Sequence, residues 1–206
     1  LLVDDHAVVR EGYRRLLERR PDIRIEAEAG LAAQALQHCR EKRFDVVVAD
    51  LSLPDLGGVE LVRRLLQRDP GTRVLVFSMH RDPLFARQAL RAGARGYVTK
   101  SAPAEDLVQA IYRVAAGQRA LSSDIAPSLA LELLDGDDNP LSRLNAREFE
   151  LLRLLLEGLD AEAIGQRLNV SPKTVQNGHY QIKSALGVRN DIELVRLAMK
   201  WGLLGP

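Results

Sequence analysis

Charged and hydroxyl side chains end four short apolar runs that lie far apart in the sequence. These residues are Asp4 and Asp5, Asp50, Ser78 and Lys100. Three carboxylates that meet at one place repel one another, so either a cation neutralises them or their pKa values rise. A hard divalent cation such as Mg²⁺ suits a site with few carboxylates that also receives phosphate oxygens. With that cation present, Asp50 could attack a phosphoryl group as a nucleophile and form an acyl phosphate.

Lys100 and Ser78 add the remaining groups that phosphoryl transfer needs. The ammonium group of Lys100 would pair with phosphoryl oxygens, and the hydroxyl of Ser78 would donate a hydrogen bond to one of them. Each residue alone is weak evidence, because an Asp pair after a strand often only caps a helix and a lysine there is usually solvated. The prediction rests on finding all five residues at the ends of apolar runs.

The apolar runs belong to a strand-and-helix pattern that repeats five times in the first half of the chain. Strands are expected at residues 1–3, 23–29, 46–49, 73–78 and 97–100, and helices follow each of them. Such alternation predicts a doubly wound α/β domain, because right-handed crossovers place helices on both faces of a parallel sheet. The carboxyl ends of all five strands would then meet at one edge, where ligands bind in open sheets of this kind.

The second half of the chain reads as helices only. Asn145 and Glu148 form a capping-box pattern, and Ser171 followed by Pro172 is a strong helix start. A short helix ending at Leu168, a tight turn and a second helix predict helix-turn-helix geometry. We therefore expect a domain over residues 1–117, a linker with a possible helix over 118–140, and an all-α helix-turn-helix domain over 141–206.

Composition sets broad limits on the function. The 206 residues carry a net charge of +1, yet residues 163–190 contain no Asp or Glu and form a local basic region. Cys39 is the single cysteine, which suits a reducing compartment. Without an apolar run of about 18 residues, we expect a cytoplasmic protein with no membrane partner.

Four stretches of the first half resemble a known family. LLVDDH, VVVADLSLPDLGG, VLVFSMH and GARGYVTKSAP are similar to the receiver domain of bacterial two-component response regulators, over Leu1 to about Gly117. That fold is a five-stranded, flavodoxin-like sheet in the order 2-1-3-4-5. The resemblance implies that Asp50 accepts a phosphoryl group from a sensor histidine kinase.

The same resemblance implies roles for the residues around Asp50. Mg²⁺ would be held by Asp4, Asp5, Asp50 and the backbone carbonyl of Ser52, while Ser78 and Lys100 would engage the phosphoryl group. Tyr97 matches an aromatic residue that swings inward on phosphorylation, although an aromatic packed on an edge strand fits the sequence equally well. Ser101 follows the lysine where many receivers have a cis proline.

The stretch from Leu141 to about Leu204 resembles the LuxR-type DNA-binding domain, most specifically in SPKTV and LGVRN. Polar and basic residues on its second helix fit DNA reading: Lys173, Thr174, Gln176, Asn177, Tyr180, Gln181 and Lys183. The resemblance implies that Lys173, Thr174 and Lys183 lie near phosphates, and that Gln176, Asn177 and Tyr180 face bases. An ordinary solvated helix face is the alternative.

The last helix, Asp191 to Met199, would by the same resemblance form a dimer contact on DNA. Three residues depart from the family pattern, namely Gln176, Ala163 and Gly178, which stands where a bulky residue is usual. A glycine inside a helix costs about 1 kcal/mol relative to alanine. These departures leave the operator sequence and the affinity open.

Together the two halves resemble a NarL/FixJ response regulator, a transcription factor switched by phosphorylation and not an enzyme beyond its own phosphorylation and dephosphorylation. Phosphorylation would change the packing of residues 82–116 and favour a homodimer on double-stranded DNA, or release the helical domain from a closed form. A phosphatase of the haloacid dehalogenase type would need an acid where Ser52 stands. An orphan regulator that binds DNA without phosphorylation is the third hypothesis.

Overall fold

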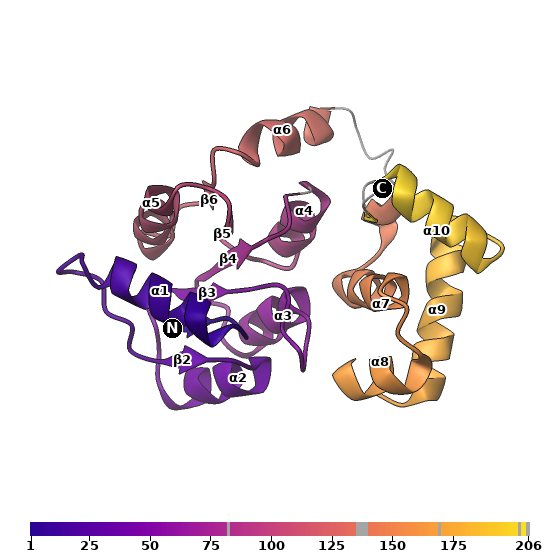
Figure 1. Ribbon diagram of the computed structural model, residues 1–206, viewed down its shortest axis with the longest axis horizontal. Helices are drawn as coiled ribbons and strands as arrows, with labels where there is room; N and C mark the ends of the chain where they lie inside the picture. The colour runs from indigo at the N-terminus through magenta and orange to yellow at the C-terminus, as the bar shows by residue number, and fades with distance from the viewer. Residues whose placement is uncertain (82, 135–139, 169, 202, 205–206) are drawn as a thin grey trace.

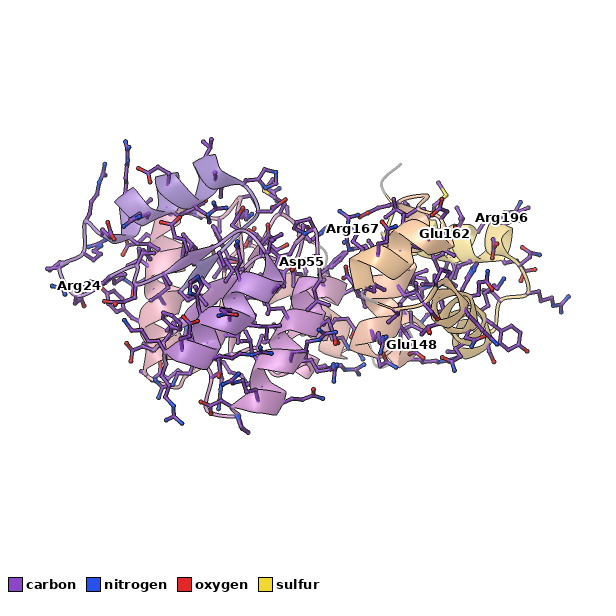
Figure 2. All side chains as sticks on the ribbon, turned by 90° about the horizontal axis from the view of Figure 1, so that it is seen from below. Arg24, Asp55, Glu148, Glu162, Arg167 and Arg196 are labelled. Carbon is purple, nitrogen blue, oxygen red and sulfur yellow. The ribbon has the colours of Figure 1, made fainter. Side chains whose placement is uncertain are left out.

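The chain folds into an α/β half and an all-helical half that lie side by side in two perpendicular views (Figure 1, Figure 2). The computed structural model describes residues 1–81, 83–134, 140–168, 170–201 and 203–204. No helix in these ranges is long and apolar enough to cross a membrane. Asp82, the first residue of the segment expected to change its packing, and residues 135–139 of the expected linker lie outside the described part of the chain.

One parallel sheet forms the centre of the first half. Its strands are β1 (Leu2–Val3), β2 (Glu28–Ala29), β3 (Val47–Ala49), β4 (Val74–Ser78), β5 (Gly96–Thr99) and β6 (Ala120–Leu121). The order β2-β1-β3-β4-β5-β6 contains the expected order and adds a sixth strand at the edge. β6 pairs Ala120 with Gly96, and a Cβ on Gly96 would meet the carbonyl oxygen of Ala120, so glycine permits this close approach.

Helices cover both faces of the sheet, which confirms the doubly wound prediction (Figure 1). They are α1 (Ala7–Leu17), α2 (Ala32–Glu41), α3 (Gly58–Arg68), α4 (Pro83–Arg91) and α5 (Ala104–Ala115). Side chains of α1 and α5 share one apolar cluster with one face of the strands, while α2, α3 and α4 contribute to the cluster on the other face. All strands therefore deliver their carboxyl ends to one edge between the two helical layers.

The helical half begins after a linker that contains α6 (Ala126–Leu134). It consists of the 3₁₀ helix η1 (Pro140–Arg143), α7 (Ala146–Leu156), α8 (Ala161–Leu168), α9 (Pro172–Leu186) and α10 (Asp191–Lys200). The predicted caps are confirmed: Asn145 and Glu148 form a capping box, and Ser171 accepts a hydrogen bond from the Thr174 N–H. Gly187 ends α9 with a φ of 69°, a left-handed conformation that favours glycine.

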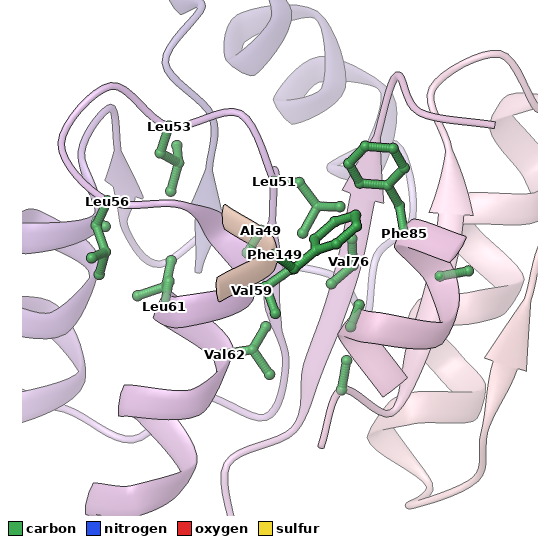
Figure 3. Close-up of a cluster of buried hydrophobic side chains, with 14 of the residues drawn as sticks. Ala49, Leu51, Leu53, Leu56, Val59, Leu61, Val62, Val76, Phe85 and Phe149 are labelled. Atoms are coloured by element: carbon green, nitrogen blue, oxygen red, sulfur yellow. The ribbon is translucent and has the colours of Figure 1, made fainter. Parts of the chain in front are cut away.

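A shared apolar core joins the two halves. Phe149 of α7 meets Phe85 of α4 edge to face, with ring centroids 5.2 Å apart, beside Leu51 and Val76 (Figure 3). The side-chain amide of Gln88 donates to the carbonyl oxygens of Leu141 and Leu144 at 3.4 and 3.3 Å. The helical half is thus docked on α3 and α4, next to the edge where the strands end.

Candidate functional site

A buried lysine joins two of the predicted carboxylates at the carboxyl edge of the sheet. Lys100 Nζ donates to Asp4 Oδ2 at 2.5 Å and to Asp50 Oδ2 at 2.6 Å. Asp4 and Asp50 are 2% and 3% exposed, so neither carboxylate can rely on water for neutralisation. β1, β3 and β5 end at the same edge of the sheet, with β4 between β3 and β5, and bring together residues that are up to 96 positions apart.

The two carboxylates favour the charged form of Lys100. Burial alone lowers the pKa of Lys100, but hydrogen bonds and attraction from Asp4 and Asp50 outweigh it and raise the pKa above its ordinary value. The ammonium group therefore stays protonated and offsets the repulsion between the carboxylates. The peptide bond after Lys100 is trans, as are all others in the described ranges.

Asp5 and Ser52 lie at the same edge and contact residues beside them. The Asp5 carboxylate lies 2.7 Å from His6 Nδ1, and ligand atoms of Asp4, Asp5 and His6 all fall within 4.8 Å of one another. The Ser52 backbone N–H donates to Asp50 Oδ1 at 3.2 Å. Carboxylate oxygens in this arrangement suit a hard divalent cation.

Ser78 and Tyr97 both contact the loop that follows β4. The buried Ser78 hydroxyl accepts a hydrogen bond from the His80 N–H at 3.3 Å. Tyr97 is fully buried, and its hydroxyl donates to the His80 carbonyl at 2.8 Å. The Tyr97 ring thus already points inward, whereas the sequence resemblance implied a ring that moves between two positions.

His80 is a residue of this site that the sequence reasoning missed. Its ring stacks on Phe85 with centroids 4.0 Å apart, and its Nε2 lies 3.4 Å from Ser52 Oγ. Burial, followed by the nearby Arg153 charge, lowers the pKa of His80 and favours its neutral form. The sequence signal that could have found it is slight, because a single histidine after a strand has many explanations.

Two charged residues of α7 also reach this region and were not anticipated. Arg153 donates from Nη2 to Glu150 Oε1 at 3.0 Å, and both side chains are largely buried. Burial alone lowers the pKa of Arg153, but the carboxylates of Glu150, Glu157 and Asp50 together raise it. The helical half therefore contributes a positive charge near the predicted phosphoacceptor, a contribution that only docking of the two halves creates.

The second predicted site lies on α9 and is open to solvent. Lys173, Thr174, Gln176 and Asn177 are exposed, and Tyr180 is 73% exposed. Val175, Ile182 and Leu186 form the buried stripe on the opposite side of the helix. Docking of the helical half on α3 and α4 uses α7 and η1, so it leaves this face of α9 uncovered.

Lys183 differs from the other residues predicted to contact DNA. Its Nζ donates to Asp191 Oδ1 at 3.0 Å, and His179 Nε2 lies 2.9 Å from the same oxygen. The hydrogen bond from Lys183, assisted by His179, lowers the pKa of Asp191. Lys183 thus braces the start of α10 in this conformation. The outer face of α10 exposes three apolar side chains, Ile192, Val195 and Met199.

Comparison with known proteins finds a family match for each half of the chain. Residues 1–112 match the response regulator receiver domain, and residues 142–198 match the bacterial regulatory proteins of the luxR family. Response regulator UvrY of Escherichia coli K12 is 36% identical over 205 residues, which cover 98% of this chain and 94% of UvrY. Response regulator GacA of Pseudomonas aeruginosa is 36% identical over 206 residues, covering 99% and 96%.

The chain belongs to the NarL/FixJ family of response regulators.

Solved structures of other response regulators share this fold. RcsB from Salmonella enterica, bound to promoter P1flhDC in the presence of the phosphomimetic BeF₃⁻, aligns with a TM-score of 0.74 and 26% identity over 95% of both chains. A LuxR-family response regulator from Aurantimonas is 52% identical over 65% of this chain and 95% of its own, with a TM-score of 0.63.

Membership of this family settles the class of function. The chain is a two-component response regulator that combines a receiver domain with a LuxR-type DNA-binding domain, and its family consists of transcription regulators and not of enzymes. The phosphatase alternative is therefore set aside. The domain boundaries at residues 117 and 141 stay a prediction.

Proposed function

We propose that this response regulator binds promoter DNA under the control of phosphorylation at Asp50. A sensor histidine kinase would supply the phosphoryl group: a carboxylate oxygen of Asp50 attacks phosphorus, the bond from phosphorus to the kinase histidine breaks, and its electron pair stays on the ring nitrogen. The observation that carries this proposal is the buried contact of Lys100 with both Asp4 and Asp50.

The residues around Asp50 would stabilise the transferred group in distinct ways. Asp4, Asp5, Asp50 and the carbonyl of Ser52 would hold Mg²⁺, which when bound neutralises negative charge on phosphoryl oxygens. Lys100 would turn from the carboxylates toward those oxygens, and Ser78 would donate its hydroxyl hydrogen to one of them. Tyr97 would report this movement to the loop after β4 through its hydrogen bond with the His80 carbonyl.

The open face of α9 would read DNA. Lys173, Thr174 and Lys183 would contact phosphates, with Lys183 first leaving Asp191, and Gln176, Asn177 and Tyr180 would face base edges. The apolar face of α10 would join two copies, so that a homodimer meets two half-sites. Since its proposed target is DNA, we propose that the protein acts in the cytoplasm.

Mass spectrometry and sedimentation of the full chain test the proposal, with Mg²⁺ and with or without a small phosphodonor. We expect wild type to gain one phosphoryl group, to dimerise and to bind a palindromic DNA site more tightly, whereas Asp50→Asn does none of these. Asp45→Asn is the matched control, because Asp45 is exposed and precedes the same strand at its other end. It should behave as wild type.

The exposed face of α9 also supports a second candidate, an orphan regulator that binds DNA without phosphorylation. In that case Asp50→Asn and wild type would bind DNA equally well, with or without the phosphodonor. Absence of phosphorylation with small donors and with candidate kinases would contradict the first proposal and favour this one.

A further inference from the structure

The amino end of α3 has no capping side chain of its own. Its N-cap residue is Gly57, which has no side chain to accept hydrogen bonds from the free N–H groups of the first turn. A Cβ placed on Gly57 would lie less than 3.0 Å from Cδ and from both carboxylate oxygens of Glu150. The Glu150 carboxylate, which belongs to α7, therefore occupies the space in which a capping side chain of residue 57 would lie.

We propose that the Glu150 carboxylate, packed against Gly57 at the amino end of α3, latches the LuxR-type half onto the receiver half. A carboxylate is favoured at this place because the amino end of a helix carries a partial positive charge. Glu150 is only 3% exposed, and Arg153 holds its Oε1 at 3.0 Å. Its neighbour Phe149 enters the apolar core beside Val59 of α3 (Figure 3). The Glu150 carboxylate and this apolar contact therefore hold the same part of α3.

The latch lies beside the predicted phosphoacceptor. The Gly58 N–H donates to the Leu51 carbonyl at 2.9 Å, and a Cβ on Gly58 would collide with the Asp50 carbonyl. The first turn of α3 is therefore in direct backbone contact with Asp50 and Leu51. If Asp50 is phosphorylated, as the proposed function requires, new negative charge appears near the Glu150 carboxylate and weakens its position.

Opening the latch would uncover α4 and leave α9 as exposed as before. Phe85 and Gln88 of α4 are buried, and both contact the helical half: Phe85 meets Phe149, and Gln88 donates to the carbonyl of Leu141 in η1. The DNA-reading face of α9, in contrast, already faces solvent. The latch thus controls access to the receiver surface around α4 and not access to the recognition helix.

Gly57→Asp tests the latch, because the new side chain caps α3 from within and places a like charge against Glu150. Gly57 has φ −60° and ψ 143°, which any residue adopts, so the receiver backbone accepts the change. Gly12→Asp is the matched control, since nothing lies within 4 Å of a Cβ at Gly12. Without phosphodonor, we expect Gly57→Asp to have a larger radius of gyration than wild type by X-ray scattering, and about tenfold faster amide exchange in α4. Gly12→Asp should match wild type in both measurements.

Glu150→Ala and the double variant make the test specific. Glu150→Ala should open the chain by itself, and Gly57→Asp should add nothing to it, since no Glu150 carboxylate is left to displace. The latch would be overturned if Gly57→Asp and Glu150→Ala both scattered X-rays as wild type does. It would also be overturned if the effects of the two substitutions on the radius of gyration added fully in the double variant. Phosphoryl mass gain is measured on the same samples: failure of wild type to gain mass contradicts the proposed function, while the scattering still decides the latch.

Discussion

The acidic edge of the receiver and the recognition helix are built in opposite ways. Asp4, Asp50 and Lys100 come from three strands, lie far apart in the sequence and are almost fully buried. The residues proposed to read DNA occupy one helix between Lys173 and Lys183 and mostly face solvent. Buried charges depend on their partners for stability, whereas exposed side chains are free to serve a ligand. Substitutions at the buried edge should therefore lower the stability of the fold, whereas substitutions on α9 should change DNA binding with little effect on stability.

The largest difference should follow from removing one lysine at each site. We expect Lys100→Met to lower the free energy of unfolding by about 3–5 kcal/mol in urea, because two buried carboxylates lose their cation. Added Mg²⁺ should recover part of the loss. Lys183→Met, which removes a partly exposed ion pair with Asp191, should cost less than about 1 kcal/mol. Equal losses would break the comparison.

Tyr180→Ala should separate binding from folding on α9. Its ring is 73% exposed, so the urea midpoint should stay at the wild-type value. Loss of a base contact should weaken specific DNA binding by about 1–3 kcal/mol and relax the preference at the affected base pair. Fluorescence anisotropy with matched and mismatched DNA measures both effects. A drop in stability without loss of specificity would show that Tyr180 is a packing residue.

Gly178→Ala tests whether the helix behind the reading face tolerates change. Alanine favours the helix by about 1 kcal/mol, although its Cβ would lie 2.5 Å from Leu151 Cδ2. A hollow of about 320 Å³, lined by both residues, gives the Leu151 side chain room to move. We expect the free energy of unfolding to rise by about 0.5–1 kcal/mol, as it should in the control Gly12→Ala. Destabilisation by Gly178→Ala alone would mean that the close packing is required.

The smallest effect should be the pH response of Asp191. Lys183 and His179 lower its pKa in the folded chain, so its contribution to stability is present above its ordinary value of 3.8 and fades as pH falls through the lowered value. Between pH 7 and pH 5 it should not change. Carboxyl NMR titration should show the pKa of Asp191 rising in Lys183→Met. An unchanged pKa would mean that the pair does not form in solution.

The sequence predicted much of the fold because the relevant signals are local. Apolar runs ending in polar residues marked the long strands, and the caps at Asn145 and Ser171 follow from hydrogen bonds within a few residues. β6 was not predicted, because a strand of two residues is too short to show an alternation of apolar and polar side chains, and its position depends on pairing with β5. The strand expected over residues 23–29 is reduced to Glu28–Ala29, since only those residues pair with β1.

The sequence by itself determined which side chains reach the edge of the sheet and which face of α9 is polar, because periodicity and strand order fix both. Only the tertiary structure decided that Lys100 lies between Asp4 and Asp50, that Lys183 holds Asp191, and that the Glu150 carboxylate lies against Gly57. Those contacts depend on how distant elements pack. No pattern within a single helix or strand carries that information, since the partner residue lies outside it.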